Sequence, residues 1–407
     1  MQVPREDAWG TADVRKPGSL LLARVAAGIA FGTPSLLTAG AWFNQFRAQN
    51  TVYQHDAVAF WAAAKHLAGG GGLSEIYSFP RFHAIEQALL PGWTAQLPYP
   101  YPPPGMLLFL PMGWWGFVPA VIGWAVVGFL ALLGAGWVLA GRQRRWLAPA
   151  LCLSPVAFVN AAFEQTGAVI AAAAAAGLML AARWPFLGGG LIGLMIIKPQ
   201  FALLPGVALL ASRNWRAVAA AMTTVAALVL VTAAQWGWSS WAAWLVQLAE
   251  LGKALLVSAS TRKFGVTPFL ALHDLGAPDA VAGTVQAMVT LALAALVAVA
   301  VRRRGLDQAS VALALAGVTL ASPYAMTYDL TFTAAALTAA LADSGVFVLR
   351  AGEPTAFLAA WIAPLVAVFE MSGKWSETWV APGIVVVGLM LVMILTRRAF
   401  AASASQP

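Results

Sequence analysis

Long apolar runs recur along this 407-residue chain and limit its possible folds more than any other feature. About 17–25 apolar residues in a helix are enough to cross the hydrocarbon core of a bilayer. Hydrophobic residues make up 60% of the chain and charged residues 10%, whereas soluble domains carry ~25% charged residues. The sequence therefore predicts an all-α polytopic membrane protein with about twelve spans.

The predicted spans form a single membrane domain over residues 19–396, with a tail at 1–18 and another at 397–407. Two short spans meet at Lys198-Pro199-Gln200, where we expect a broken hairpin. Residues 104–117 are apolar but contain two tryptophans, which are typical of the membrane–water interface. We therefore predict an interfacial helix there. The predicted spans are 19–43, 119–140, 147–163, 166–182, 186–197, 200–211, 215–235, 279–301, 306–321, 326–342, 354–369 and 378–396.

The basic residues indicate the orientation of the spans. The net charge is +8, which in a membrane protein reports topology rather than nucleic-acid binding. If both termini are cytoplasmic, most of the 24 Lys and Arg residues lie inside, including those at 142–145 and 302–304. The long loops 44–118 and 236–278 then face outward with all four histidines. We expect the chemistry on the outer face of a bacterial-type inner (plasma) membrane.

Asp56 directly precedes a segment with helical periodicity, in which Phe60, Ala64 and Leu67 share one face. One interpretation is that Asp56 caps this helix. The other is that it acts as a general base at the membrane surface. His55 lies beside it and is a candidate substrate contact.

The segment Tyr99-Pro100-Tyr101-Pro102-Pro103 is rigid and extended because of its prolines. It could simply stiffen the approach to the interfacial helix. Alternatively, exposed rings of Tyr99 and Tyr101 would suit the C–H faces of a sugar.

Ionisable side chains at span ends within a bundle are costly unless they are used or paired. Glu164-Gln165 and Lys198-Pro199-Gln200 are two such places. Lys198 could bind a phosphate, or it could form a structural ion pair with Glu164.

Two further outer segments carry charge. Arg262-Lys263 breaks the inside bias of basic residues; it could be solvated, or it could clamp a phosphate. Tyr328-Asp329 lies at the mouth of a predicted span, where a carboxylate needs a partner or water, although capping would also explain it.

Other signals exclude some classes of protein. The glycines at 69–72 lack the Lys-Ser/Thr of a phosphate-binding loop and predict a turn. The histidines lack the spacing of a metal-binding helix. Cys152 is the only cysteine, so no disulfide framework is expected. We predict no metal, no cofactor and no nucleic-acid partner.

In order, these landmarks resemble the membrane glycosyltransferases of family 87. The resemblance rests on Asp56, the glycine turn before Ile76-Tyr77, the Tyr-Pro segment, Glu164-Gln165 and Ile197-Lys198-Pro199. It covers about residues 19–345. The chain departs from the family's pattern at Glu164, where the family often has Gly. It also has Tyr328-Asp329 where some members have His.

The resemblance implies a GT-C-like bundle with interfacial helices in a long first outer loop. It implies an inverting transfer of a hexose, with mannose the first candidate, from a polyprenyl-phosphate donor to a lipid or glycan hydroxyl. Asp56 would be the general base, and Lys198, Arg262 and Lys263 would hold the donor phosphate. The predicted substrate contacts are His55, Tyr99, Tyr101, Glu164, Gln165, Gln200, Tyr328 and Asp329.

Two other classes of protein stay open. A transporter or flippase of lipid-linked sugars would show paired repeats with broken helices at the midplane, and the sequence contains one broken hairpin. A non-catalytic assembly subunit would not need so many polar side chains on one face.

Overall fold

The computed structural model describes residues 28–40, 56–257, 264–344, 352–371 and 380–401. These residues are helical almost throughout, and the extended structure among them is one isolated bridge between Gly265 and Met326. The predicted all-α class is therefore confirmed for the described part of the chain. Residues 28–40, within the predicted first span, form a helix beside α19.

The named elements follow the chain in this order: α2 (Ala57–Ala68), α3 (Leu73–Ile76), α4 (Phe79–Leu89), α5 (Pro103–Phe109), η1 (Leu110–Trp114), α6 (Phe117–Leu139), η2 (Gly141–Gln143), α7 (Arg144–Cys152), α8 (Pro155–Ala162), α9 (Gly167–Ala181), α10 (Pro185–Gly193), η3 (Leu194–Ile197), η4 (Pro199–Phe201), α11 (Leu203–Ala211), α12 (Trp215–Trp236), α13 (Trp238–Val257), α15 (Pro268–Asp274), α16 (Asp279–Arg304), α17 (Gln308–Ala321), η5 (Thr327–Leu330), α18 (Thr331–Ser344), α19 (Glu353–Met371) and α20 (Val380–Ala401).

Four described helices are long and apolar enough to cross a bilayer: Phe117–Leu139, Trp215–Trp236, Asp279–Arg304 and Val380–Phe400. Shorter apolar helices occupy Gly167–Ala181, Pro185–Ile197 and Gln308–Ala321. With its many apolar helices, the chain is a multi-pass membrane protein. The number of about twelve spans is not confirmed.

The predicted span 147–163 is wrong as a single helix. Helix α7 ends at Cys152, and α8 begins at Pro155 after a short break. Proline lacks the backbone N–H that would continue the ladder, so it favours the first turn of a new helix. The Ser154 hydroxyl accepts a hydrogen bond from the backbone N of Ala157 at 3.3 Å and caps α8.

The broken hairpin at Lys198 is confirmed. Helix α10 tightens into η3, the chain changes direction at Lys198, and η4 leads into α11. The region 104–117 is likewise not a span, since α5 and η1 are both short. Trp114 and Trp115 at its end are 73% and 54% exposed, as expected for an interfacial segment.

Glycines let α10 fit between α9 and α12. A Cβ atom on Gly188 would collide with the backbone of Ala181 in α9, and one on Gly189 would collide with the Ala217 carbonyl in α12. Small residues allow backbones to approach closely, which is a common way of packing membrane helices.

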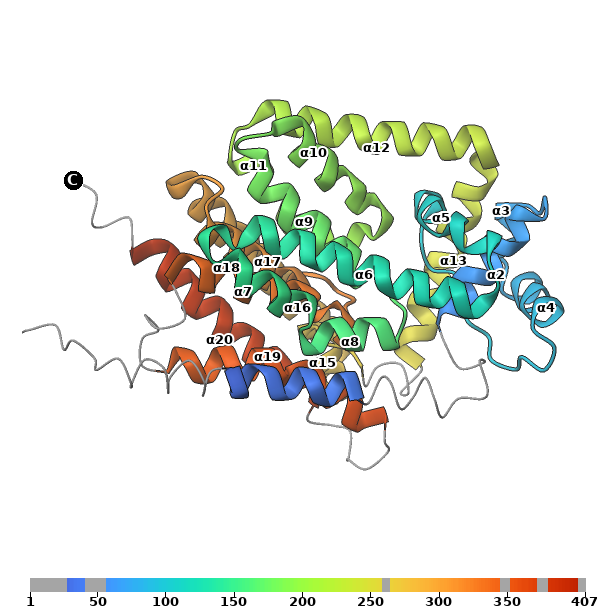
Figure 1. Cartoon of the computed structure of the whole chain (residues 1–407). Coiled ribbons are helices and arrows are strands. Elements are labelled where there is room, and N and C mark those ends of the chain that lie inside the picture. The colour runs from blue at the N-terminus through green and yellow to red at the C-terminus, as the bar shows by residue number, and fades with distance from the viewer. Residues whose placement is uncertain (1–27, 41–55, 258–263, 345–351, 372–379, 402–407) are drawn as a thin grey trace, which may run out of the picture.

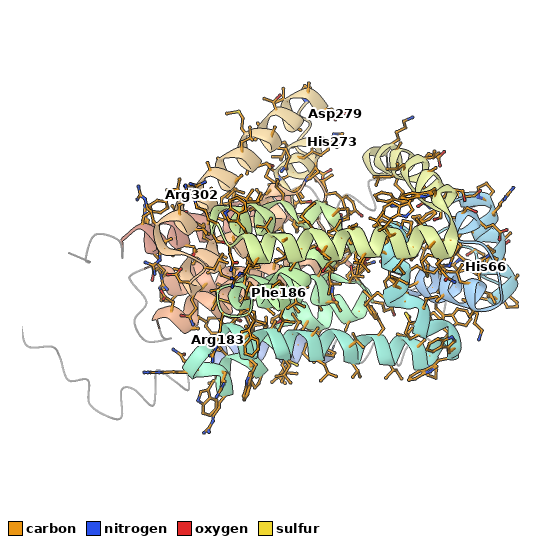
Figure 2. The ribbon with its side chains drawn as sticks, turned by 90° about the horizontal axis from the view of Figure 1, so that it is seen from above. His66, Arg183, Phe186, His273, Asp279 and Arg302 are labelled. Atoms are coloured by element: carbon orange, nitrogen blue, oxygen red, sulfur yellow. The ribbon has the colours of Figure 1, made fainter. Side chains whose placement is uncertain are left out.

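The elements gather at two ends of the bundle. Helices α2 to α5 and α13 lie together at one end, while α7, α18 and α20 extend toward the other (Figure 1). Arg183 and Arg302 lie near the second end, and His66 lies at the first (Figure 2). The part of the first predicted outer loop that forms α2 to α5 thus lies at one end; which end faces the cytoplasm stays a prediction.

Candidate functional site

Asp56 occupies the N-cap position of α2, whose residues 57–64 are all buried. Its side chain makes no capping hydrogen bond to this helix. Instead, Gln165 Nε2 donates to Asp56 Oδ2 at 2.7 Å. The interpretation of Asp56 as the cap of its own helix is therefore wrong, and the carboxylate contacts the turn before α9.

Glu164 caps α2 in place of Asp56. The backbone N of Ala57 donates to Glu164 Oε2 at 3.0 Å, and a negative charge at a helix N-terminus is favourable. Glu164 itself is 3% exposed and has a φ of 55°, which is uncommon for a residue other than glycine. Its carbonyl accepts from Trp124 Nε1 at 2.8 Å. This strained turn is thus fixed through both its side chain and its backbone.

Tyr101 holds the other end of the Gln165 amide. The Tyr101 hydroxyl donates to Gln165 Oε1 at 2.9 Å and lies 2.9 Å from the Thr166 hydroxyl. Burial, together with the negative charges of Asp329 and Asp56, raises the pKa of Tyr101, although its hydrogen bond with Thr166 acts in the opposite direction. The phenol therefore stays protonated and remains a hydrogen-bond donor.

The expectation that Tyr99 and Tyr101 present exposed rings is wrong. Tyr99 is fully buried and Tyr101 is 3% exposed. Both rings lie against Phe60 of α2, with centroids 6.4 Å and 5.5 Å away. The Tyr77 hydroxyl donates to the Tyr101 carbonyl at 2.9 Å. The Tyr-Pro segment is a packed wall beside the site, because its rings complete the core around α2.

Lys198 and Asp329 form a buried ion pair, with Lys198 Nζ 2.6 Å from Asp329 Oδ1. The pair that the sequence suggested between Lys198 and Glu164 is therefore replaced by one with Asp329. The Lys198 ammonium also lies 5.0 Å from the Phe201 ring and 5.2 Å from the Tyr328 ring. Asp329 Oδ2 accepts from the backbone N of Met326 at 3.0 Å. The break at Lys198 is thus tied to the break before α18.

The hydrogen-bonded residues around Asp56 and the Lys198–Asp329 ion pair meet at Gly167, the first residue of α9. A Cβ atom there would lie 3.2 Å from Asp329 Oδ1 and 2.8 Å from the Tyr328 carbonyl. Asn160, with its amide oriented to satisfy both atoms, donates to the Gln165 carbonyl at 3.0 Å and accepts from Gly167 N at 3.2 Å. The turn 164–167 therefore joins the Asp56 group to the ion pair.

Three predicted site residues, His55, Arg262 and Lys263, lie outside the described residues. The chain resumes at Phe264, whose carbonyl accepts from Thr327 N at 2.8 Å. Gly265 and Met326 form the isolated bridge. The segment that follows Lys263 thus returns beside the turn that carries Asp329. Gln200 is half-buried in η4.

Asn160, Thr166 and Trp124 belong to the site but were not predicted from the sequence. Of these three, Asn160 has a signal in the sequence, because an amide side chain inside an apolar run requires hydrogen-bond partners. Thr166 and Trp124 carry no comparable signal, because threonine and tryptophan are common in membrane helices and at their ends.

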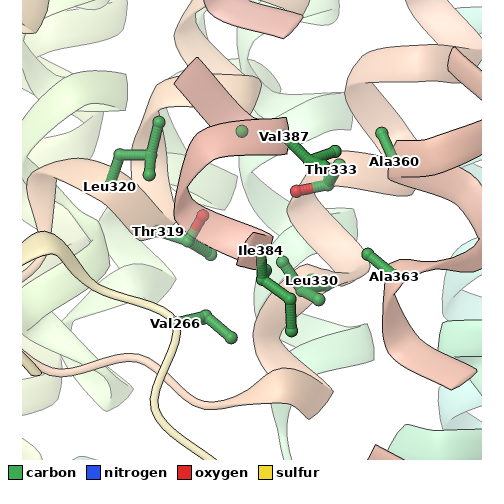
Figure 3. A pocket seen from close by; sticks show the side chains of 10 residues that line it. Val266, Thr319, Leu320, Leu330, Thr333, Ala360, Ala363, Ile384 and Val387 are labelled. Atoms are coloured by element: carbon green, nitrogen blue, oxygen red, sulfur yellow. The ribbon is translucent and has the colours of Figure 1, made fainter. Parts of the chain in front are cut away.

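A small, mostly apolar pocket lies next to the Asp329 turn (Figure 3). Its apolar lining includes Val266, Leu330, Ala360, Ile384 and Val387. Because its polar groups are the hydroxyls of Thr319 and Thr333, it lacks the titratable groups that acid–base chemistry requires. Within the described ranges, no three side chains of His, Cys, Asp or Glu are grouped to hold a metal ion. A reaction without metal stays a prediction.

Comparison with known protein families gives a match over the middle of the chain. The family model described as glycosyltransferase family 87 matches residues 99–323, which is more than half of the 407 residues. The matched region contains Tyr101, Gln165 and Lys198, while Asp56 precedes it and Asp329 follows it. No curated protein and no solved structure matches the chain.

Proposed function

This chain belongs to glycosyltransferase family 87, and we propose that it transfers a hexose from a polyprenyl-phosphate donor to a hydroxyl group of a lipid or glycan. Mannose is the first candidate for the sugar. The reaction would invert the anomeric carbon, with Asp56 as general base, on the extracytoplasmic face of a bacterial inner membrane. A GT-C-like arrangement of the helices is part of the proposal.

The observation that carries this proposal is the 2.7 Å hydrogen bond from Gln165 to Asp56. It places a carboxylate from outside the matched region against a side chain from within it. A general base has to be held in one position, because proton transfer requires hydrogen-bond geometry with the substrate. Asp56 meets this requirement, since Glu164 holds its helix and Gln165 holds its side chain.

The proposed step is a single displacement. The acceptor hydroxyl oxygen attacks the anomeric carbon while its proton passes to Asp56. The bond between the anomeric carbon and the donor phosphate oxygen breaks, and the polyprenyl phosphate leaves with the bonding electron pair. Atoms and charge balance without a nucleotide, a metal or a cofactor.

Lys198, Arg262 and Lys263 are the proposed partners of the leaving phosphate. Lys198 is the one within the described residues, and its side chain is 6% exposed. It is neutralised by Asp329 in this structure, so a phosphate would have to share the ammonium with that carboxylate. A cation in a site of low dielectric stabilises negative charge that develops in the transition state.

Replacing Asp56 by Asn tests the proposed base. Asparagine keeps an oxygen that can accept from Gln165 Nε2, so folding should survive, but it cannot take a proton. We expect turnover to fall by ~10²-fold or more. The assay uses purified protein in nanodiscs, radiolabelled polyprenyl-phosphate mannose and a bacterial membrane lipid extract as acceptor.

Asp279→Asn is the matched control for this test, because Asp279 is also an aspartate at the start of a helix but is 58% exposed. It should retain parental turnover. Near-parental activity in well-folded Asp56→Asn would remove Asp56 from the mechanism. Mass spectrometry of glycolipids and surface glycans, with and without the protein, would identify the sugar and the acceptor.

A transporter of lipid-linked sugars is the second candidate. One observation favours it: the break at Lys198 faces a second irregular segment that carries Asp329. Broken helices that meet within a bundle occur in transporters. Reconstituted vesicles would separate the two functions, since a transporter would move polyprenyl-phosphate mannose across the bilayer without consuming it.

A further inference from the structure

We propose that Gln165 and Tyr101 are positioning residues for the Asp56 carboxylate, and not the substrate contacts that the sequence suggested. Gln165 fixes the orientation of the carboxylate, and Tyr101 fixes the orientation of the Gln165 amide. The inference rests on the proposed function in taking Asp56 as the reacting group. Its central claim, that these two side chains control Asp56, can be tested without any sugar substrate.

The donor of each hydrogen bond among Thr166, Tyr101, Gln165 and Asp56 can be assigned. An ionised carboxylate only accepts hydrogen bonds, so the Gln165 atom that faces it must be the nitrogen. The amide oxygen then faces Tyr101, whose single hydroxyl hydrogen it accepts. The Thr166 hydroxyl is left to donate to the Tyr101 oxygen. The hydrogen bonds therefore run from Thr166 to Tyr101, from Tyr101 to Gln165, and from Gln165 to Asp56. The last of them is the shortest, at 2.7 Å.

The backbone around Gln165 is held as firmly as its side chain. Glu164, the preceding residue, receives the first N–H of α2 through its carboxylate. Asn160 donates to the Gln165 carbonyl at 3.0 Å once its amide is oriented to satisfy both atoms. Glu164 thus caps the helix that begins after Asp56, and Gln165 binds the Asp56 side chain. A substrate contact would not require this double attachment to the base.

A hydrogen bond donated to a carboxylate favours its ionised form. Removing the Gln165 amide should therefore make the protonated form of Asp56 more favourable. Gln165→Met leaves the other titratable groups around the site in the sequence, although Tyr101 loses the hydrogen bond that it donates to the Gln165 amide. These groups are Tyr101, Glu164, Lys198, Tyr324, Tyr328 and Asp329.

The test uses a carbodiimide, which reacts with protonated carboxyl groups. Full-length protein in lipid nanodiscs is treated with dicyclohexylcarbodiimide over a range of pH, and peptide mass spectrometry measures the fraction of Asp56 labelled. In Gln165→Met we expect the labelling midpoint to rise by about one pH unit. Tyr101→Phe should move the midpoint in the same direction by less, because the amide remains but its orientation is no longer fixed.

The control is Gln247→Met. Gln247 is another buried glutamine, but it lies on α13, and among the described residues its amide atoms have no hydrogen-bond partner. It should leave the Asp56 midpoint at the parental value. Labelling of Glu75, which lies beside His66, should be the same in all four proteins and serves as the internal reference.

Parental midpoints in both Gln165→Met and Tyr101→Phe would overturn the inference. So would a mere rise in KM at constant kcat, which is the result expected of a substrate contact. A positioning role predicts a loss in kcat of about 10-fold or more. The two proposals fail separately. If Asp56→Asn is active, Asp56 is not the general base, but the labelling shifts in Gln165→Met and Tyr101→Phe can still occur. If Asp56→Asn is inactive and these labelling shifts are absent, only the positioning role is overturned.

Discussion

At the scale of single residues, the charged side chains Asp56 and Lys198 each bond to a side chain that is distant in the sequence. Asp56 and Gln165 are 109 positions apart, and Lys198 and Asp329 are 131 positions apart. The second contact is a buried ion pair, and removing one partner of such a pair usually costs about 3–5 kcal/mol because the other charge remains buried. Lys198 can therefore affect activity through stability alone, and a single substitution would not separate the two roles.

A double substitution separates them. We expect Lys198→Met to lower the free energy of unfolding by about 3–5 kcal/mol, and Lys198→Met with Asp329→Asn to restore most of it. Asparagine can still accept from Met326 N, as Asp329 Oδ2 does. If Lys198 also holds the leaving phosphate, kcat/KM in the stable double variant should still be lower by ~10²-fold.

Asp329→Asn alone is the control for activity, and thermal unfolding in detergent measures stability. Parental kcat/KM in the double variant would show that Lys198 only joins the two breaks in the bundle. Arg262 and Lys263 would then be the remaining cations to test as ligands of the phosphate.

At the scale of helices, glycines decide how closely neighbours pack. Helix α10 contacts α9 through Gly188 and α12 through Gly189 and Gly193. A methyl group at any of these positions would meet backbone or side-chain atoms of the neighbouring helix. By contrast, Gly206 in α11 has open space where a Cβ atom would lie.

This contrast gives a matched pair of substitutions. Gly189→Ala should separate α10 from α12 and destabilise the protein by about 1–3 kcal/mol, as expected for overpacking. Gly206→Ala should be neutral, or stabilising by about 0.4–1 kcal/mol, because alanine restricts the unfolded chain. Thermal unfolding of both variants in one detergent measures the difference. Equal melting temperatures would contradict the close packing at Gly189.

At the scale of the whole molecule, two of the arginines that the sequence assigns to the cytoplasm lie at the opposite end of the bundle from α2, the helix that follows Asp56. Arg183 and Arg302 lie near one end and His66 near the other (Figure 2). If the arginine-rich end is cytoplasmic, Asp56 and its surroundings are on the outer face. The polyprenyl-phosphate donor would then be used on that side of the membrane.

Cysteine labelling tests this orientation. In a Cys152→Ala background, Ala95→Cys lies between α4 and α5, and Ala182→Cys lies at the end of α9; both positions are exposed. An impermeant maleimide added to intact spheroplasts should label Ala95→Cys, and it should label Ala182→Cys only after lysis. The reverse pattern would invert the topology and place the proposed reaction in the cytoplasm.

The sequence by itself determined the local structure of this protein. Apolar runs long enough for helices predicted α6, α12 and α16 within a few residues, because burial in lipid requires this composition. The break at Lys198-Pro199 was also predicted, since proline cannot continue a helix and a lysine is costly in one. The order of motifs was sufficient to predict the family.

Only the tertiary structure decided which residues meet. Asp56 could have capped its own helix, but Glu164 takes that position and leaves Asp56 to Gln165. The rings of Tyr99 and Tyr101 could have been exposed, but they fill the core beside α2. Hydrogen bonds and ion pairs between distant segments depend on how helices pack, and the pattern within one segment carries no information about its partner. The site therefore had to be read from the fold, whereas its helices could be read from the sequence.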